Sequence, residues 1–524
     1  MQDSAAPIKK ILIAGGGTAG WMTALILAHS LRHQSVAIEL IESPEIGIIG
    51  VGEGSTPALK SFFEILDIAE QEWMPACNAT FKCGITFKNW STKSGFAGAD
   101  LAKHGLESYF HPFPTPLEEL TLPIFMQYAQ ARVRGANVYA HPDRFFLAAR
   151  LAQKNLAPKQ IAAVKPDPLY GYHFDATLLG RFLRTKANAW GITYRQDHIL
   201  AAVQDDAGNI SHLNTRSGEV IAADFFIDCT GFQSLLLQKT LGVSFKSYAN
   251  NLLNDNALAL PSAITSELSS ETISTALSCG WAWRIPLTNR FGNGYVYSSA
   301  FCTADAAETE MRAHLGLLNA DIEVRHLKMK IGRVDEHWKN NCVGVGLAQG
   351  FIEPLEATAL YLVQQTAILL GQSLAKNNRA LEAQQKFNQE INGYFDGVRD
   401  YIVTHYKTSS RTDTEYWRAN TANPRDVSDT MLQLYEAWLS GKNLAAAVAQ
   451  LGIGKYYAAP SWYCIFAGMN IWGNPARLRL PHEGEVKYDL ADMDKLIASA
   501  SENFVDQRRY LQKMVAANVA EISV

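Results

Sequence analysis

The sequence lacks the features that mark several common classes of protein. Its seven cysteines are scattered and never occur as Cys-x-x-Cys, so neither a disulfide framework nor a zinc site is predicted. It contains no basic run, and a net charge of −4 over 524 residues is too small to indicate nucleic acid or anionic lipid as a partner. Repeats and low-complexity segments are absent as well. We therefore expect a globular, cytoplasmic protein with reduced thiols and no metal.

The chain is long and apolar enough to bury a large core. Hydrophobic residues make up 48% of it and charged residues 19%, a balance typical of a globular protein with two or more lobes. The apolar run at residues 11–31 has the length of a signal peptide or a membrane span. Its Gly-Gly-Gly core and the cofactor motif within it argue against both, so we expect no membrane association.

A nucleotide site is predicted near the amino terminus. Residues 9–31 read as a short strand, a glycine turn and a helix, and Gly15, Gly17 and Gly20 fit Gly-x-Gly-x-x-Gly. The first glycine permits the tight turn, the second lets backbone approach a pyrophosphate, and the third lets helix and strand pack closely. The next strand ends in Glu42, where an acid can accept hydrogen bonds from an adenosine ribose. The segment therefore predicts a dinucleotide cofactor.

Two later stretches favour FAD over NAD. Residues 219–232, EVIAADFFIDCTGF, predict a hydrophobic strand that ends near Asp228, a pattern similar to the second nucleotide-contacting strand of large flavoproteins. Residues 340–351 predict another buried strand followed by glycine, just before an apolar helix. In the aromatic-hydroxylase class of flavoenzymes, which this arrangement resembles, the equivalent helix points its amino terminus at the flavin. The cofactor domain is therefore discontinuous in sequence.

Two carboxylates stand at the head of the apolar run 350–370, GFIEPLEATALYLVQQTAILL. Pro354 suits a first helical position, and acids in a first turn meet the positive end of the helix dipole. This capping interpretation needs only one of Glu353 and Glu356, so the second acid calls for another explanation.

Residues 78–90, NATFKCGITFKNW, alternate as one strand. Lys82 would share a face with Thr86 and Lys88, opposite Phe81 and its apolar neighbours, so periodicity alone predicts a solvent-exposed lysine. Residues 50–66 predict a flexible glycine loop that leads into a helix with a hydroxyl cap.

Another strand is predicted at residues 280–287, GWAWRIPL, which Pro286 ends. It places Trp281 and Trp283 on one face, and a core role explains such a pair as well as a catalytic one.

Five motifs occur here in the order seen in the flavin-dependent tryptophan halogenases and their wider halogenase-like relatives, which the sequence resembles. They are Gly-x-Gly-x-x-Gly, GVGEGSTP, FKCGITFKNW, GWAWRIPL and GFIEPLEAT. Trp-x-Trp-x-Ile-Pro is diagnostic of that family and separates it from the hydroxylases. The resemblance covers residues 10 to about 420, and the rest more loosely.

The resemblance implies an α/β fold, with a discontinuous Rossmann-type FAD-binding domain of the aromatic-hydroxylase/halogenase class and an additional, mainly helical C-terminal lobe. We expect the FAD-binding and halogenation core in residues 1–370, including an inserted substrate-facing sheet at about 75–165 and 245–330. The substrate-side helical lobe would span residues 371–524.

Residue by residue, the resemblance implies that Lys82 and Glu356 are catalytic. It also implies that backbone N–H groups of Thr358 and Ala359 hold the halide, as expected at a helix start. The residues that would bind FAD, including the flavin strap around Glu53, are Gly15, Gly17, Thr18, Ala19, Gly20, Glu42, Gly52, Glu53, Ser55, Asp228, Leu347 and Leu360.

On the substrate side, the resemblance implies that Trp281 and Trp283 form a wall that keeps the substrate away from the flavin. His111 and Phe113 match a segment that packs around indole in the tryptophan enzymes, although a proline-rich surface loop explains them equally well. Trp462 and Tyr463 fall where those enzymes place substrate-holding aromatic residues.

One departure from the family pattern concerns the halide. Where the family has Glu-Ser-Thr-Gly, this chain carries Ala357 and Ala359 in place of serine and glycine. Alanine at 359 keeps the N–H but adds a methyl group and restricts the backbone. We expect bromide to be favoured over chloride.

These features together predict a halogenase that uses FADH2, O2 and halide. Hypohalous acid would reach a separate pocket, where a lysine polarises it or forms a haloamine, and a carboxylate assists electrophilic substitution of tryptophan, indole or a related aromatic. No second nucleotide fingerprint is present, so FADH2 would come from a separate NADH-dependent flavin reductase; a homodimer is compatible with the sequence. The alternatives are a flavin monooxygenase that hydroxylates an aromatic and a catalytically silent FAD-binding protein.

Overall fold

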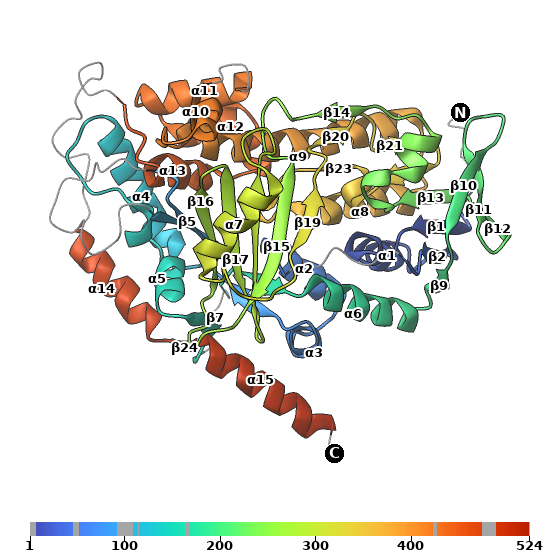
Figure 1. The fold of residues 1–524 in the computed structure, drawn as a ribbon, viewed down its shortest axis with the longest axis horizontal. Helices are drawn as coiled ribbons and strands as arrows, with labels where there is room; N and C mark the ends of the chain where they lie inside the picture. Colours follow the sequence, from blue (N-terminus) through green and yellow to red (C-terminus); the bar gives the residue numbers. More distant parts are fainter. Residues whose placement is uncertain are drawn as a thin grey trace. The chain divides into compact units, whose positions relative to one another are not determined.

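The computed structural model describes residues 7–45, 52–91, 108–113, 115–162, 168–422, 427–473 and 489–522 (Figure 1). Residues 50 and 51, which begin the predicted glycine loop, lie outside this part. Within the described ranges, no helix combines the length and the apolar character that a membrane crossing requires.

The chain divides into two compact units. The first contains residues 1–78, 174–249 and 329–396, and the second contains residues 79–173, 250–328 and 397–524.

The first unit is built on a six-stranded sheet in the order β21-β22-β13-β1-β2-β9. Strands β22, β13, β1, β2 and β9 pair in parallel, and β21 is antiparallel to β22 at the edge. Because their faces are covered, β1 and β13 are apolar and almost wholly buried. The strands are β1 (Lys10–Ala14), β2 (Ala37–Glu42), β9 (Thr193–Gln196), β13 (Phe225–Asp228), β21 (Trp338–Lys339) and β22 (Cys342–Gly344).

Helix α1 packs against both α6 and α8. Two small antiparallel sheets, β10-β11-β12 and β14-β20-β23, complete the unit. The remaining bounds are α1 (Thr18–Ser30), β3 (Glu53–Gly54), α2 (Ala58–Ile65), α3 (Glu70–Ala76), α6 (Ala176–Ala189), β10 (Ile199–Gln204), β11 (Ile210–Thr215), β12 (Val220–Ala222), β14 (Phe245–Ser247), β20 (Gly332–Val334), β23 (Gly350–Phe351) and α8 (Ala359–Ala375).

The second unit is built on a seven-stranded sheet in the order β19-β15-β18-β17-β16-β5-β6. All neighbours are antiparallel except β16 and β5. These strands are β5 (Gly84–Lys88), β6 (Ser108–Pro112), β15 (Asn256–Ser262), β16 (Glu271–Leu277), β17 (Gly280–Pro286), β18 (Phe291–Tyr297) and β19 (Arg325–Lys328).

Helices surround this sheet, with α13 packed on β6, α7 on β18 and α14 on α5. Strand β4 (Thr80–Lys82) pairs with β8 (Gly171–Phe174), and β7 (Leu156–Gln160) pairs with β24 (Phe504–Asp506). The helices are α4 (Glu118–Val133), α5 (Leu147–Gln153), α7 (Ala304–Leu315), α10 (Glu415–Ala422), α11 (Asp429–Leu439), α12 (Leu444–Gln450), α13 (Ala459–Gly468), α14 (Leu490–Ser501) and α15 (Gln507–Ile522); α9 (Leu381–Thr408) begins in the first unit and ends in the second.

The α/β class and the discontinuous parallel sheet are confirmed, and the chain beyond residue 370 is mainly helical as expected. The boundaries of the compact units, however, differ from the predicted division of the chain at residue 370. Residues 397–524 join the inserted segments, because α13 and α14 pack on β6 and α5. The assignment of the two predicted lobes to halogenation and to substrate binding stays a prediction.

The strand predicted over residues 78–90 is instead two strands, β4 and β5, interrupted at Cys83. There the backbone changes partners: Cys83 N–H donates to the Ser270 carbonyl at 2.7 Å, and Phe113 N–H donates to the Cys83 carbonyl at 2.7 Å. Since β4 and β5 belong to different sheets, one alternating pattern cannot describe both faces.

The helix expected to begin at Pro354 begins at Ala359 instead. Pro354–Glu356 form only a single 3-10 turn, and Ala357 follows it in the left-handed conformation, which ends that turn. Neither acid therefore lies in the first turn of α8, and the interpretation of one of them as a cap of this helix was wrong.

Candidate active site

The three motif glycines of the turn between β1 and α1 have different surroundings. Gly15 has φ +114°, and a Cβ there would lie 2.2 Å from the Cys229 carbonyl oxygen. A Cβ on Gly20 would lie 2.0 Å from the Gly15 carbonyl oxygen, which confirms close packing of helix on turn. By contrast, a Cβ on Gly17 would meet no heavy atom within 4 Å. The turn therefore leaves open space at the position predicted to face a pyrophosphate.

Glu42 lies against this turn. A Cβ on Gly16 would lie 1.7 Å from Glu42 Oε2, so only glycine fits beside the carboxylate. The Tyr194 hydroxyl donates to Glu42 Oε1, and Arg184 Nη1 lies 3.6 Å from the same oxygen. These contacts fix the carboxylate beside the glycine turn, where it can accept ribose hydroxyls.

Asp228, predicted to contact FAD, is fully buried and serves the turn after β13. Its Oδ1 accepts from Thr230 N–H at 3.0 Å and from the Thr230 hydroxyl at 2.6 Å. Its Oδ2 accepts from the N–H groups of Leu236 at 2.9 Å and Leu237 at 2.8 Å. The carboxylate therefore orders this loop, and its contact with FAD stays a prediction.

A second turn approaches α1. Gly346 has φ +68°, and a Cβ there would lie 2.7 Å from Ala19 Cβ. This contact brings the turn that contains Leu347 next to Ala19, two residues predicted independently as cofactor contacts. Leu360, in the first turn of α8, is 9% exposed.

The predicted strap is described from Gly52 onward. Gly52 has φ +87°, Ser55 is buried, and Glu53 is half-buried in β3. Burial, and then the negative charge of Asp175, raise the pKa of Glu53 to about 7. Glu53 is therefore a carboxyl group that titrates near neutral pH.

Both acids of the Glu-Pro-Leu-Glu segment are buried, Glu353 at 0% and Glu356 at 3% exposure. Glu353 makes no side-chain capping hydrogen bond to the turn that follows it. The capping interpretation is therefore wrong for Glu353. Burial of two carboxylates is costly, so both positions are expected to interact with other groups.

The backbone strain next to the halide position is at Ala357, with φ +56° and ψ 36°. An L-residue in this conformation costs about 1–2 kcal/mol. Ala359 is the first residue of α8 and its φ is not positive, so its methyl group adds no strain there. The alanine whose backbone is strained is therefore Ala357, and not Ala359 as expected. Thr358 precedes the helix, is buried, and makes no side-chain cap, so α8 begins with the unsatisfied N–H groups typical of a helix start.

In the second unit, Lys82 ends β4 and is 0% exposed. The interpretation of Lys82 as a solvent-exposed strand lysine was wrong, since the change of sheet at Cys83 breaks the alternation. Its Nζ lies 5.2 Å from the centroid of the Phe113 ring, a favourable position for a cation.

Two contacts fix the strand that carries Lys82. The Thr80 hydroxyl donates to the Pro286 carbonyl at 2.7 Å, which ties β4 to the end of the Trp-x-Trp-x-Ile-Pro strand. His173, on β8, hydrogen-bonds Thr80 through Nδ1 at 3.0 Å. Burial, together with the charge of Lys82, lowers the pKa of His173 well below its ordinary value. The imidazole is therefore a neutral neighbour of the lysine.

His111 and Phe113 are buried, His111 in strand β6 and Phe113 immediately after it, so the surface-loop interpretation was wrong. The Tyr401 hydroxyl donates to the Ser461 carbonyl at 3.1 Å and lies 2.9 Å from His111 Nε2. A hydroxyl carries one proton, so the imidazole donates from Nε2. Tyr401 also stacks on Tyr457, with ring centroids 3.6 Å apart.

Trp462 and Tyr463 have different surroundings, as consecutive residues of α13 must. The ring of Trp462 lies 4.9 Å from that of Tyr401, the residue that hydrogen-bonds His111. Tyr463 instead donates to Gln130 Oε1 at 3.1 Å, and its ring is 5.5 Å from that of Trp438. Of the two, only Trp462 lies with the predicted substrate residue His111.

Trp281 and Trp283 share a face of β17, with ring centroids 6.1 Å apart, and both are buried. Trp283 packs against Gly294 of β18, where a Cβ would lie 2.0 Å from a ring atom of Trp283. Gly294 therefore makes room for this ring, and the predicted aromatic face exists.

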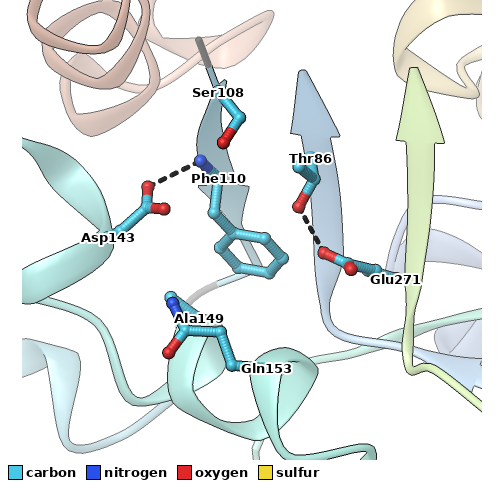
Figure 2. A pocket seen from close by; sticks show the side chains of 7 residues that line it. All are labelled: Thr86, Ser108, Phe110, Asp143, Ala149, Gln153 and Glu271. Carbon is cyan, nitrogen blue, oxygen red and sulfur yellow. Dashed lines mark hydrogen bonds between the residues drawn. The ribbon is translucent and has the colours of Figure 1, made fainter. Parts of the chain in front are cut away.

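A pocket of 340 Å³ lies on the other face of strands β5 and β6 (Figure 2). Thr86 and Phe110 line it, whereas Ile85 and His111, the next residue pair in the register, point away. Asp143 accepts from Phe110 N–H at 2.7 Å, and Glu271 accepts from the Thr86 hydroxyl, as Figure 2 shows. The predicted substrate residues do not line this pocket.

The predicted catalytic residues lie in different compact units, Glu356 in the first and Lys82 in the second. Their pairing therefore stays a prediction. Within each unit the structure does bring predicted residues together: Gly15, Gly20 and Glu42 in one, and Lys82 with Phe113 in the other.

Several residues of these sites were missed in the sequence. Gly16 could have been found, because it lies inside Gly-Gly-Gly. Tyr194, Arg184, His173 and Tyr401 carry no local signal, since their contacts join residues 93 to 290 positions apart.

Known proteins are similar to this chain over most of its length. The model of the tryptophan halogenase family matches residues 10–480. Tryptophan 6-halogenase SttH of Streptomyces toxytricini is 35% identical over 459 residues, 82% of this chain and 83% of that protein. Tryptophan 7-halogenase RebH of Lentzea aerocolonigenes is 33% identical over 91% of this chain and 92% of that protein. The crystal structure of a tryptophan halogenase from Shewanella frigidimarina matches with a TM-score of 0.83 and 32% identity, over 98% of each chain. The chain therefore belongs to the tryptophan halogenase family.

Proposed function

We propose that this enzyme halogenates an electron-rich aromatic compound, tryptophan or another indole, with FADH2, O2 and halide as co-substrates. FADH2 would be delivered by a separate NADH-dependent flavin reductase. The observation that carries the proposal is the complete burial of Lys82 at the end of a strand whose alternation predicts a solvated side chain. Lysine is almost never fully buried unless its charge is used or compensated.

The residues of the first unit fit a dinucleotide flavin. The open space at Gly17 admits a pyrophosphate, and Glu42 lies where it can accept ribose hydroxyls. When bound in its reduced form, FAD supplies the oxidation of halide by O2 to hypohalous acid. The start of α8 would hold the halide through the N–H groups of Thr358 and Ala359, which the helix dipole favours.

Lys82 would act on the hypohalous acid. Its ammonium can donate a hydrogen bond that polarises the halogen–oxygen bond, or its neutral amine can carry the halogen as a haloamine. Because His173 is held neutral, it adds no second positive charge beside the lysine. Phe113 would hold the cation from one side.

The remaining residues would position the aromatic substrate and remove its proton. Glu356 would stabilise the cationic intermediate of the substitution and accept its proton. His111, Phe113 and Trp462 would contact the aromatic ring, and Trp281 and Trp283 would keep it away from the flavin. The relatives named above act on tryptophan, which makes indoles the first substrates to test.

The test uses purified enzyme, a flavin reductase, NADH, FAD and bromide with a panel of indoles, read by mass spectrometry. We expect a brominated product that Lys82→Met abolishes and that the matched variant Lys88→Met preserves, since Lys88 is exposed on β5. A product that gains oxygen instead of bromine would show a monooxygenase. Bound FAD without either product across the panel would show a silent flavin-binding protein.

A further inference from the structure

Two cysteines of the second unit lie at adjoining turns. Cys279 is the residue before β17, and Cys302 lies between β18 and α7. Ser298 links them through the backbone: its N–H donates to the Cys279 carbonyl at 3.1 Å, and its carbonyl accepts from Cys302 N–H at 3.1 Å. Residues 23 positions apart in the sequence are thereby held around one serine.

A side-chain hydrogen bond links the two turns as well. Cys279 Sγ donates to the carbonyl of Phe301, the neighbour of Cys302, at 3.5 Å. Cys302 Sγ donates in turn to the Thr303 carbonyl at 3.4 Å. Burial raises the pKa of both thiols; the nearby Cys302 adds to the rise for Cys279, whereas the nearby Cys279 partly offsets it for Cys302. Both residues are half-buried, as is Cys229, whereas Cys77, Cys83, Cys342 and Cys464 are buried.

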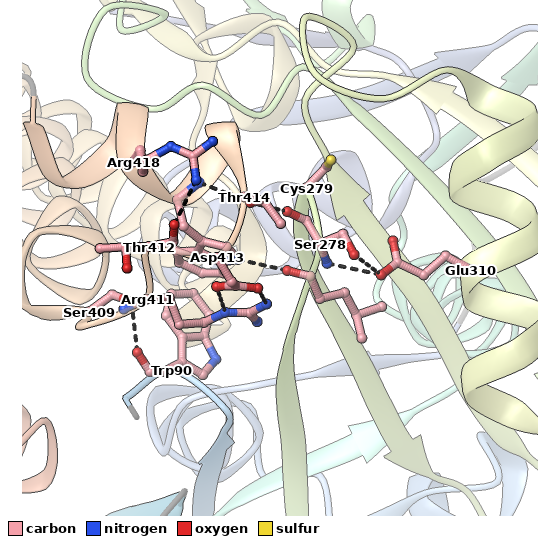
Figure 3. Close-up of polar contacts among 12 residues, drawn as sticks. Trp90, Ser278, Cys279, Glu310, Ser409, Arg411, Thr412, Asp413, Thr414 and Arg418 are labelled. Atoms are coloured by element: carbon pink, nitrogen blue, oxygen red, sulfur yellow. Dashed lines mark hydrogen bonds and ion pairs between the residues drawn. The ribbon is translucent and has the colours of Figure 1, made fainter. Parts of the chain in front are cut away.

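The turn that carries Cys279 is firmly held, as Figure 3 shows. Glu310 of α7 accepts from Ser278 N–H at 3.0 Å and from the Ser278 hydroxyl at 2.6 Å. The Tyr295 hydroxyl accepts from Cys279 N–H at 3.0 Å and donates to Glu310 at 2.9 Å. Because Cys302 lies just before α7, this network attaches both cysteines to the same helix.

The surroundings favour strong oxidants over mild ones. Burial is the main cause that raises the pKa of Cys279 to about 12 and also raises that of Cys302, and the charge of Glu310 adds to both. Protonated thiols react slowly with oxidants that need a thiolate. Cys302 is the more reactive of the two, since the nearby Cys279 partly offsets the rise in the pKa of its thiol.

We propose that Cys279 and Cys302 form an oxidation site, at which hypohalous acid that escapes the reaction converts the thiol pair into an intramolecular disulfide. Cys302 sulfur attacks the halogen of HOX and displaces hydroxide, which takes up the Cys302 thiol proton and leaves as water; the product is a sulfenyl halide. Cys279 sulfur then attacks that sulfur, and halide and a proton leave. In sum, two thiols and HOX give a disulfide, water and HX: the thiols lose two electrons and the halogen gains them. The proposal rests on the proposed function only for the source of the oxidant.

The oxidation site has a consequence for the enzyme. Cys279 directly precedes Gly280, the first residue of the Trp-x-Trp-x-Ile-Pro strand, so the disulfide would tie this strand to the loop before α7. The thiol pair, whose turns are fixed by hydrogen bonds, would react with escaped hypohalous acid. This reaction would protect the tryptophans of β17 from the same oxidant.

The test treats the full-length, FAD-loaded enzyme with one molar equivalent of reagent hypobromite. Free thiols are then alkylated, and an unreduced digest is read by mass spectrometry. We expect a peptide that joins Cys279 to Cys302, with the other five cysteines still alkylated. The joined peptide should be lost in Cys279→Ser and in Cys302→Ser but retained in the control Cys77→Ser. Oxidation of other cysteines, or of methionines, without the joined peptide would overturn the proposal.

A second arm separates this proposal from the proposed function. Enzyme, reductase, NADH, FAD and bromide are incubated without an aromatic substrate, and the same peptide is expected. If reagent hypobromite forms the disulfide, while the substrate-free reaction forms no disulfide and the separate reaction with the indole panel forms no brominated product, the thiol pair is supported and the halogenase function is rejected. If indole is brominated and reagent hypobromite gives no disulfide, the oxidation site is rejected and the function stands.

Discussion

Lys82 Nζ lies 5.2 Å from the centroid of the Phe113 ring, and both side chains are buried. Burying an ammonium group is costly, and the face of an aromatic ring offsets part of that cost. The relationship joins the end of β4 to the residue after β6. It makes Phe113 a support for the lysine as well as a predicted substrate contact.

Replacing Phe113 should therefore remove a stabilising contact of the Lys82 ammonium as well as a contact with the substrate. We expect Phe113→Leu to lower kcat about 2- to 30-fold, since a desolvated cation–π contact contributes about 0.5–2 kcal/mol. The measurement is bromination of indole under saturating substrate. Phe110→Leu is the matched control, because Phe110 is equally buried in β6 but points to the other face. Equal losses in the two variants would show a packing effect only.

Alanine substitutions at two glycines of the nucleotide turn should affect different properties: one the stability of the fold, the other the affinity for FAD. Gly20→Ala places a Cβ 2.0 Å from backbone and should lower the free energy of unfolding by about 1–3 kcal/mol. Gly17→Ala meets no protein atom and should leave the Tm of the FAD-free enzyme unchanged. Its affinity for FAD should still fall about tenfold, or about 1.4 kcal/mol, in a fluorescence titration. Unchanged FAD affinity in Gly17→Ala would contradict a pyrophosphate at this turn.

Substituting glycine for Ala357 and for Ala359 should change the free energy of unfolding in opposite directions. Ala357→Gly removes the left-handed strain of an L-residue and should raise the free energy of unfolding by about 1 kcal/mol. Ala359→Gly weakens the first turn of α8 and should lower it by about 0.5–1 kcal/mol. Urea denaturation of the two variants measures both effects. A change of the same sign in the two variants would contradict backbone strain at Ala357.

Glu53 should make stability depend on pH. Burial and Asp175 raise its pKa from 4.5 to about 7, so the folded state holds a proton that the unfolded state releases. Its stabilising contribution is complete below pH 4.5 and is lost as the pH rises to 7, at about 1.4 kcal/mol for each pKa unit of difference. We expect Glu53→Gln to become more stable relative to the wild type across this window. A difference between the two proteins that is flat from pH 4.5 to 7, measured by urea denaturation, would refute the raised pKa.

Bromide should be preferred over chloride. Bromide is less strongly hydrated and more easily oxidised, and the halide position departs from the family pattern at two alanines. With equal concentrations of the two halides, we expect mainly brominated indole by mass spectrometry. The variant with Ala357→Ser and Ala359→Gly restores the family residues and should shift the product towards chlorinated indole. Mainly chlorinated product from the wild type would reject this expectation.

The sequence by itself determined the features that depend on neighbouring residues. The spacing of Gly15, Gly17 and Gly20 specifies a turn whose geometry involves only one strand, one turn and one helix. Apolar runs likewise predicted β1, β13 and α8, although the start of α8 was misplaced by the left-handed Ala357. These signals are local, because steric limits on the backbone act between adjacent residues.

Only the tertiary structure decided what surrounds those residues. Lys82 is buried because the chain changes sheets at Cys83, which an alternating pattern cannot reveal. Glu42 is fixed by Tyr194, 152 positions away, and His111 by Tyr401, 290 positions away. Burial and hydrogen bonding are set by whichever distant segments pack together, so the sequence identified the reactive groups while the fold set their environment.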